Sequence, residues 1–252
     1  MCRVLLQFGP VTIYSYGAMM VAAFLTATWV ASRAAGRLPP AQRALSPAQI
    51  VDVSCLTMLS GVLGARLFFV AKHWEVFIRQ PLEIPAIWHG GLIWYGGVAG
   101  GLLAGAVYAH IQKVSFCRGL DQIIPFVPLG HTLGRIGCFL NGCCYGEVSH
   151  AWCSVTGADG QPRIPTQLLE SVALLGLFLV LRRFQERRET APAGRLFGVY
   201  LIGYAVIRFF IEFLRGDQSI VWAGLTLQQL LSVGMLLAGA TLFRRGQRTG
   251  AR

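Results

Sequence analysis

Residues 50–71 read IVDVSCLTMLSGVLGARLFFVA, a mostly apolar run of the length that a transmembrane helix needs, which is roughly 20 residues. Six similar runs flank it, and Pro125 and Pro128 interrupt the start of one of them, as membrane helices tolerate. Together they predict an all-α, polytopic integral membrane protein with about seven transmembrane helices. The other runs cover residues 11–31, 92–111, 123–140, 167–181, 196–214 and 225–243.

The composition argues against an ordinary soluble domain. Of the 252 residues, 54% are hydrophobic and 13% are charged, whereas a soluble protein carries about a quarter charged residues. The net charge of +11 would suit nucleic acid, but the basic residues lie between the apolar runs, where membrane topology places them. No long polar linker divides the chain. We therefore expect one transmembrane domain over residues 1–252 and no nucleic-acid partner.

The distribution of basic residues also predicts the orientation. If the C-terminus is cytoplasmic, one set of loops holds fourteen basic residues and the opposite set holds four. Because cytoplasmic loops carry the excess of Lys and Arg, we expect a periplasmic N-terminus and a cytoplasmic C-terminus. The first set is Arg33, Arg37, Arg43, Lys113, Arg118, Arg182, Arg183, Arg187, Arg188, Arg195, Arg244, Arg245, Arg248 and Arg252, and the second is Arg3, Lys72, Arg79 and Arg163.

Four further arginines lie within or at the ends of apolar runs, and this orientation places all of them in the outer half of the membrane. A charged side chain in the bilayer is costly and usually faces the protein interior or a water-filled cavity. The shared depth of Arg66, Arg135, Arg208 and Arg215 therefore predicts an anion site that opens outward. Snorkelling toward the headgroups is an alternative, and it accounts better for Arg66 and Arg215 than for the other two.

Residues 208–215, which read RFFIEFLR, place three charges on one helical face. Arg208, Glu212 and Arg215 follow one another at spacings of four and three residues. Pairing with Glu212 would fix the directions of the guanidinium groups, and a fixed guanidinium can grip a phosphate with two parallel hydrogen bonds. An ion-pair cluster with a purely structural role would show the same pattern.

Residues 134–146, GRIGCFLNGCCYG, place glycines on both sides of Arg135 and place Asn141 at the outer end of a helix. Glycines at these positions would let a ligand approach the backbone closely. The stretch therefore extends the predicted anion site.

Residues 88–97, WHGGLIWYGG, place His89 and Tyr95 among paired glycines. This pattern suggests a pocket wall with a proton carrier, although the aromatic residues could equally form an interfacial belt. Gly97, Gly101 and Gly105 continue at four-residue spacing, and for these we expect close helix packing.

These motifs, in this order, resemble the signature of the prolipoprotein diacylglyceryl transferase family. The resemblance covers nearly the whole chain and rests on residues 90–97, 134–146, 165–170 (PTQLLE) and 208–215. It implies a bacterial inner-membrane transferase that moves the diacylglyceryl group of phosphatidylglycerol to the lipobox cysteine thiol of a preprolipoprotein. A thioether forms and glycerol phosphate leaves. We expect a monomer without a cofactor or a metal.

The resemblance also implies roles for individual residues. Arg135 and Arg208 would hold the lipid phosphate as catalytic groups. Tyr95 stands where the family usually has the histidine proposed as the base, and because a phenol with a pKa near 10 is a weak base at neutral pH, His89 could substitute for it. The expected substrate-binding residues are Tyr16, Asn141, Gly146, Glu212, Arg215, Arg66, Gly96, Gly97, Gln167 and Glu170.

Other departures from the family pattern concern the cysteines. Cys138 and Cys143 stand where the family usually has Asn and Glu, and Ile164 and Leu169 where it often has His and Tyr. Cys138, Cys143, Cys144 and Cys153 all lie near the predicted outer face, which would suit a thiol oxidoreductase or a metal site. No C-x-x-C pair or histidine spacing supports either, so we expect a structural disulfide. A non-catalytic lipid-binding relative is a third alternative.

Overall fold

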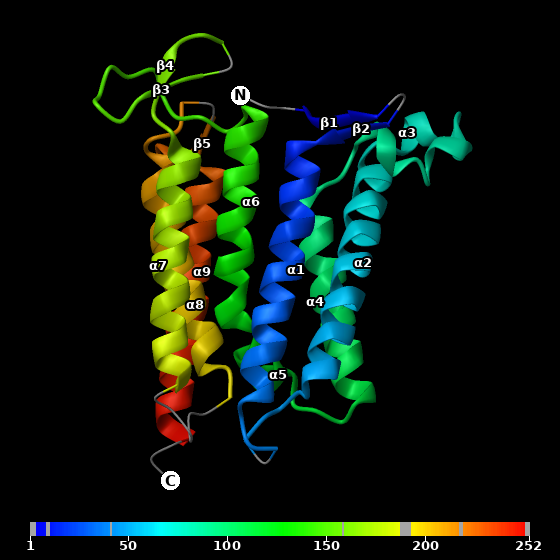
Figure 1. Cartoon of the computed structure of the whole chain (residues 1–252), viewed down its shortest axis with the longest axis vertical. Coiled ribbons are helices and arrows are strands. Elements are labelled where there is room, and N and C mark those ends of the chain that lie inside the picture. Colours follow the sequence, from blue (N-terminus) through cyan, green and yellow to red (C-terminus); the bar gives the residue numbers. More distant parts are fainter. Residues whose placement is uncertain are drawn as a thin grey trace. The chain divides into compact units, whose positions relative to one another are not determined.

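The computed structural model is mostly helical, as predicted, and it describes residues 4–8, 11–40, 42–157, 159–186, 193–216 and 219–249. Side chains of residues 8, 11 and 245–249 are outside this description. Each predicted apolar run overlaps a helix (Figure 1). The helices of five or more residues are α1 (Ser15–Gly36), α2 (Pro47–Lys72), α4 (Trp94–Ile111), α5 (Phe116–Ile123), α6 (Val127–Asn141), α7 (Thr166–Glu186), α8 (Arg195–Glu212) and α9 (Leu227–Thr249).

Three short antiparallel sheets make the all-α prediction too strict. They pair β1 (Val4–Phe8) with β2 (Val11–Tyr14), β3 (Val155–Thr156) with β4 (Pro162–Arg163), and β5 (Ile220–Trp222) with β6 (Leu225–Thr226). The first sheet precedes α1 and the other two lie between helices, and in each the pairing satisfies backbone groups outside the helices. Further single turns are α3 (Trp74–Phe77), η1 (Pro81–Glu83), η2 (Ile87–His89) and η3 (Ile124–Phe126).

Within the described ranges, three helical stretches are long and apolar enough to cross a membrane. They are Ser15–Gly36, Pro47–Lys72 and Phe116–Asn141, and the last contains α5, η3 and α6. The prolines predicted to interrupt this stretch stand in the first turns of η3 and α6, where a missing N–H costs little. The protein is thus a membrane protein by these criteria, whereas seven spans and the orientation stay predictions. Of the basic residues from which the orientation was predicted, four lie outside the described residues: Arg3, Arg187, Arg188 and Arg252.

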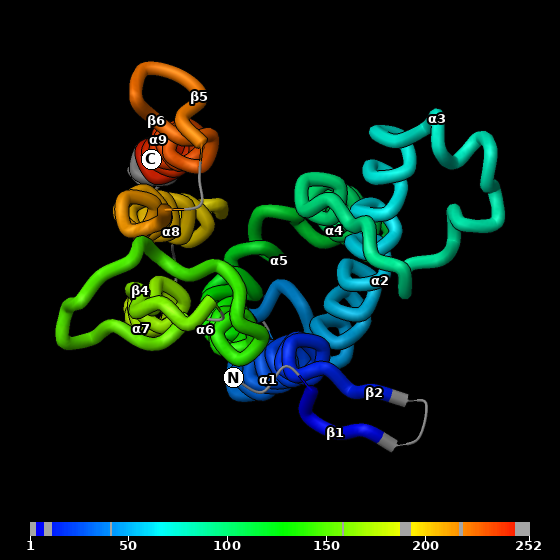
Figure 2. Tube along the Cα trace, turned by 90° about the horizontal axis from the view of Figure 1, so that it is seen from above, coloured from blue at the N-terminus to red at the C-terminus, as the bar shows by residue number. Residues whose placement is uncertain are grey.

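The chain folds into two compact units, Ser32–Gly119 and Met1–Ala31 with Leu120–Arg252. In the first unit α2 packs along α4, and Figure 2 shows the two helices side by side. A Cβ atom added at Gly64 would lie 2.4 Å from the Gly96 oxygen, and one added at Gly100 would lie 2.4 Å from the Ser60 oxygen. The predicted ridge of Gly97, Gly101 and Gly105 also lies at this contact. A Cβ atom added at any of these three glycines would lie 3.4 Å or more from its nearest neighbour, so the packing there is less tight. Glycine therefore permits the close approach of the two backbones.

The same unit contains a connection, residues 73–93, that one buried arginine holds together. Arg66 is only 6% exposed, and its guanidinium donates hydrogen bonds of 2.5–3.2 Å to four carbonyl oxygens. It also lies within 5.6 Å of the ring centroids of Phe69 and Phe77. The buried charge is thereby satisfied by backbone dipoles of the connection. The accepting residues are Glu83, Ile84, Gly90 and Gly91.

The other unit is a bundle in which α6 packs on α7, α7 on α8 and α8 on α9 (Figure 1). The N-terminal part of α1 lies against α6, because Gly130, Gly134 and Gly137 leave room for it. A Cβ at Gly137 would lie 2.9 Å from the Met19 Cβ, and one at Gly134 would lie 3.6 Å from the Met20 sulfur. The glycines on both sides of Arg135, expected to admit a ligand, thus face a neighbouring helix.

Asp121 of α5 binds the start of α8, although the two are far apart in the sequence. Its carboxylate oxygens accept hydrogen bonds from the backbone N–H groups of Gly194, at 2.7 Å, and Phe197, at 2.8 Å. These N–H groups have no partner within the helix, and the positive end of the helix dipole favours a carboxylate there. The contact sets the register of α8, the helix that carries Arg208 and Glu212.

Candidate active site

A single buried carboxylate joins α6, α7 and α8. Glu170 of α7 is 1% exposed, and its Oε1 accepts a hydrogen bond of 2.9 Å from Nη2 of Arg135 on α6. Its Oε2 lies 3.9 Å from Nη1 of Arg208 on α8. The two arginines predicted to hold a phosphate therefore converge on one group, although 73 positions separate them in the sequence (208 − 135).

A second buried carboxylate extends this cluster toward α9. Nη2 of Arg208 lies 2.8 Å from Oε2 of Glu212, one turn further along α8, as the sequence spacing predicted. Oε1 of Glu212 accepts a hydrogen bond of 2.8 Å from the Thr226 hydroxyl. Thr226 and Gln229 also form a reciprocal capping arrangement at the start of α9. The direction of the Arg208 side chain is thus fixed from two sides.

Within the described part of the chain, each arginine has one buried nitrogen that lacks a hydrogen-bond partner. Nε of Arg135 and Nη1 of Arg208 have no hydrogen-bond acceptor among the residues that the structure describes. The 3.9 Å between Arg208 and Glu170 is an ion pair but too long for a hydrogen bond. Since Glu170 and Glu212 balance the two formal positive charges, the cluster has directed donors but no large excess of charge.

Two further residues of the cluster, His131 and Tyr204, were not predicted from the sequence. Nε2 of His131 lies 4.0 Å from Oε1 of Glu170, and the His131 ring lies 5.5 Å from that of Tyr204. His131 precedes Arg135 by four residues and Tyr204 precedes Arg208 by four, so both share a helical face with the arginine that follows. That spacing was the signal available in the sequence.

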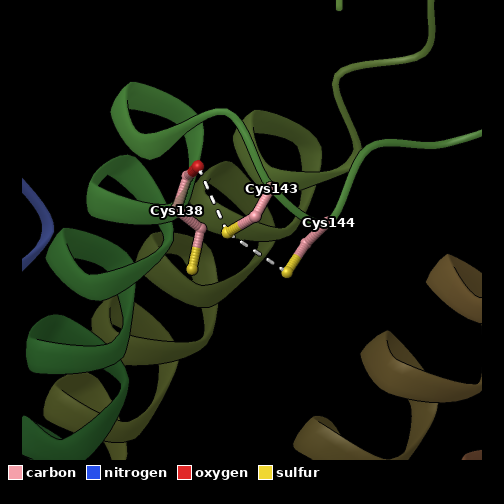
Figure 3. A group of neighbouring side chains, drawn as sticks. All are labelled: Cys138, Cys143 and Cys144. Atoms are coloured by element: carbon pink, nitrogen blue, oxygen red, sulfur yellow. Dashed lines mark hydrogen bonds between the residues drawn. The ribbon is translucent and has the colours of Figure 1, made fainter. Parts of the chain in front are cut away.

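A tight turn after α6 carries three thiols. Gly142 adopts a left-handed conformation (φ 76°) that ends the helix, and Cys144 adopts one too (φ 64°). Figure 3 shows the sulfur atoms of Cys138, Cys143 and Cys144 gathered beside the turn, all within 4.8 Å of one another. The six described cysteines are free, so the predicted disulfide is wrong for them. The sulfurs of Cys143 and Cys144 are 3.6 Å apart, whereas a disulfide bond is about 2.05 Å long.

The start of α7 holds this turn in place. The Thr166 hydroxyl donates to the Cys144 oxygen at 2.8 Å, and Nε2 of Gln167 donates to the Cys143 oxygen at 2.5 Å. Both α7 side chains are buried. The stretch 165–170 therefore has two tasks in this structure: Thr166 and Gln167 fix the thiol turn, and Glu170 fixes the arginines.

The thiols of the turn differ in their electrostatic surroundings. A hydrogen bond from Cys138 lowers the pKa of Cys144 to about 5, and the nearby Arg215 and Arg135 act in the same direction. Burial raises the pKa of Cys143, although a hydrogen bond with the Asn141 side chain opposes this effect. One thiolate is thus favoured beside the arginines.

Of the predicted binding residues, Tyr16, Asn141, Gly146 and Arg215 lie around this turn. Tyr16 is an electrostatic neighbour of Arg135 and of the three thiols. Arg215 follows α8 and interacts with Cys144. A Cβ at Gly146 would lie 2.5 Å from the Leu214 oxygen, so this glycine brings the turn against the end of α8. Their substrate-binding roles stay predictions.

The other predicted residues belong to the compact unit of residues 32–119. Nδ1 of His89, whose side chain is 59% exposed, lies 2.7 Å from Oε2 of Glu83. Tyr95 is exposed and stacks edge-on with Trp94. Gly96 packs against α2, as does Gly97 less tightly, and Arg66 binds the connection. The proposed catalytic and binding roles of these five residues also stay predictions.

Comparison with known proteins agrees with the motifs. Residues 3–245 match the family described as prolipoprotein diacylglyceryl transferase. A phosphatidylglycerol–prolipoprotein diacylglyceryl transferase of Photobacterium profundum is 36% identical over 95% of this chain and 91% of its own length. Proteins of the same name from Geobacter sulfurreducens and Geobacillus kaustophilus are each 34% identical, over 95% and 96% of this chain and 93% and 91% of their own lengths. The chain therefore belongs to the prolipoprotein diacylglyceryl transferase family.

Proposed function

We propose that this protein transfers the diacylglyceryl group of phosphatidylglycerol to the lipobox cysteine thiol of a prolipoprotein. Membership of the family supports this activity over a thiol oxidoreductase or a non-catalytic lipid-binding protein. The structural observation that carries the proposal is the convergence of Arg135 and Arg208 on Glu170, with one buried donor left on each arginine.

In this reaction the acceptor sulfur attacks the diacylglyceryl carbon that is bonded to the phosphate oxygen. The carbon–sulfur bond forms, the carbon–oxygen bond breaks, and the electron pair leaves with glycerol phosphate. The thiol proton is released at the same time, so one proton balances the extra negative charge of the product. Donors fixed before the reaction stabilise the charge that develops on the phosphate, which is the role we assign to Arg135 and Arg208.

The proposal includes the topology of the protein in the membrane. Seven spans, a periplasmic N-terminus and a cytoplasmic C-terminus would place the thiol turn and the arginines in the outer half of the bacterial inner membrane. Lipid could then enter sideways from the bilayer, and the lipobox segment could approach from the periplasmic side. We further propose that the protein acts as a single transferase domain and as a monomer, without nucleic acid.

Complementation tests the proposal in cells. A bacterial strain depleted of its own diacylglyceryl transferase receives this protein or its Arg135→Ala variant, with Arg182→Ala as the control. Arg182 also pairs with a glutamate, Glu186, but at the other end of α7. We expect growth and diacylglyceryl-modified lipoprotein, detected by mass spectrometry, with the wild type and the control only. Unmodified lipoprotein in cells that contain folded wild-type protein would refute the proposed activity.

A further inference from the structure

The three thiols of the turn after α6 have the spacing of metal ligands. Their sulfur atoms all lie within 4.8 Å of one another, and those of Cys143 and Cys144 are 3.6 Å apart (Figure 3). A zinc–sulfur bond is about 2.3 Å long, so two sulfurs on a tetrahedral zinc ion lie roughly 3.8 Å apart. Small side-chain adjustments would therefore bring all three sulfurs to one ion. Spacing in the sequence gave no such indication, because two of these cysteines are adjacent.

The backbone of the turn places two neighbouring side chains in one place. Successive side chains of an extended chain point in opposite directions. The left-handed conformation of Cys144, which is unfavourable for a residue other than glycine, instead brings its sulfur beside that of Cys143. Buried side chains of Thr166 and Gln167 then bind the carbonyl oxygens of both cysteines. The strain is maintained by the surrounding structure, as is common at ligand sites.

The charges around the turn suit a bound metal cation that has one coordination position free. Three thiolates on a divalent ion leave one negative charge, and Arg135 and Arg215 are electrostatic neighbours of Cys144. In the part of the chain that the structure describes, no fourth Cys, His, Asp or Glu joins this group. Zinc sites with three protein ligands and an open fourth position are the catalytic kind, in which the open position receives water or substrate.

We propose that Cys138, Cys143 and Cys144 bind one zinc ion whose fourth ligand is the acceptor cysteine of the prolipoprotein. The proposal rests on the proposed function and assigns removal of the thiol proton, which the sequence left to Tyr95 or His89. The acceptor thiol loses its proton to water as it binds zinc, because a coordinated thiol is deprotonated. Its sulfur then forms the bond to the diacylglyceryl carbon, glycerol phosphate leaves with the electrons of the carbon–oxygen bond, and the neutral thioether dissociates from zinc.

The metal site is tested on the purified full chain in detergent, with zinc and with cobalt as a spectroscopic probe. We expect about one zinc per chain by elemental analysis, and cobalt should give the near-ultraviolet absorption of thiolate coordination. Cys144→Ser should lose both signals, and Cys153→Ser, which changes a free cysteine outside the group, should keep them. Well below one equivalent in the wild type, or full binding by Cys144→Ser, would overturn the proposal.

Three further measurements keep the test decisive. If Cys144→Ser does not fold, alkylation of the wild-type protein replaces it: zinc should protect the three thiols, and equal alkylation with and without zinc would contradict the site. A lipobox peptide should change the cobalt spectrum, and the same peptide with Ser in place of Cys should not. Unchanged spectra with both peptides would refute acceptor binding at the metal. Transfer by metal-free protein would refute the zinc role alone, whereas no transfer by metal-loaded protein would refute the proposed function.

Discussion

At the scale of single residues, the direction of the arginines depends on a buried carboxylate. Arg135 and Arg208 come from different helices, and Glu170 is the group that both approach, at 2.9 Å and 3.9 Å. Glu212 adds a second contact to Arg208 at 2.8 Å. Buried charges of this kind must be paired, so the arrangement is sensitive to the loss of either carboxylate.

Glu170→Gln keeps the shape of this side chain and removes its charge. Two guanidinium groups would then face each other without their shared counter-ion, so we expect transfer to fall by a factor on the order of 100. The unfolding free energy should fall by about 3–5 kcal/mol, because a buried charge loses its partner. Lipid transfer to a lipobox peptide and thermal unfolding in detergent measure the two effects.

Glu186→Gln is the matched control, because Glu186 lies on the same helix and pairs with Arg182 at an exposed position. We expect its rate to stay within about twofold of the wild type. Equal rates for Glu170→Gln and the control would show that the carboxylate does not organise the site.

For Arg66 we predict an effect on stability and not on transfer, because its N–H donors are already bound by backbone oxygens. Arg66→Gln should lower the unfolding free energy by on the order of 3 kcal/mol, since several charge-assisted hydrogen bonds are lost. Proteolysis within residues 73–93 should become faster than in Arg79→Gln, a change at an exposed position nearby. A raised KM for phosphatidylglycerol with unchanged stability would instead support the predicted substrate-binding role.

The sequence predicted the pair Arg208–Glu212, because both residues lie on one helix at a known spacing. It placed Glu170 among the binding residues only through the family resemblance. The contact of Glu170 with Arg135 joins two helices, and no local pattern encodes which faces will meet. The same limit explains why His131 and Tyr204 were missed and why the thiols were assigned to a disulfide.

At the scale of elements, the lengths of the helices follow from the apolar runs, whereas their pairing follows from glycine. A run of apolar residues is a local property, so the helices α1, α2, α4 and α6 to α9 could be predicted. The short helix α5 lies almost entirely between two of the runs and was not predicted. The contact between α2 and α4 depends on Gly64, Gly96 and Gly100, which lie on two helices. The sequence showed the glycine ridge on α4, but it did not show that α2 is the partner.

Gly100→Ala tests this pairing. A methyl group at this position would lie 2.4 Å from the Ser60 oxygen, which is a backbone atom, so we expect destabilisation of about 1–3 kcal/mol. Gly176→Ala in α7 is the control, because a Cβ there meets nothing within 4 Å. The control should be neutral or more stable by up to about 1 kcal/mol. Similar melting temperatures for both variants would contradict close packing of α2 on α4.

At the scale of the whole molecule, the orientation in the membrane can be tested with the natural cysteines. The proposed topology places Cys117 in a cytoplasmic loop and Cys153 in a periplasmic one. In variants that keep only one of the two, a membrane-impermeant maleimide should label Cys153 in intact spheroplasts. It should label Cys117 only after lysis. The reverse pattern would invert the topology and place the site on the cytoplasmic side.

The most direct measurement is the rate of transfer by purified Arg135→Ala and Arg208→Ala, with phosphatidylglycerol vesicles and a lipobox peptide. Both side chains are proposed to hold the same phosphate, so each variant should be slower than Arg182→Ala by about 100- to 1000-fold. The double variant should lose much less than the product of the two losses, because residues that act as a unit are not additive. If either single variant transfers lipid within twofold of the control, the two arginines do not form the phosphate site.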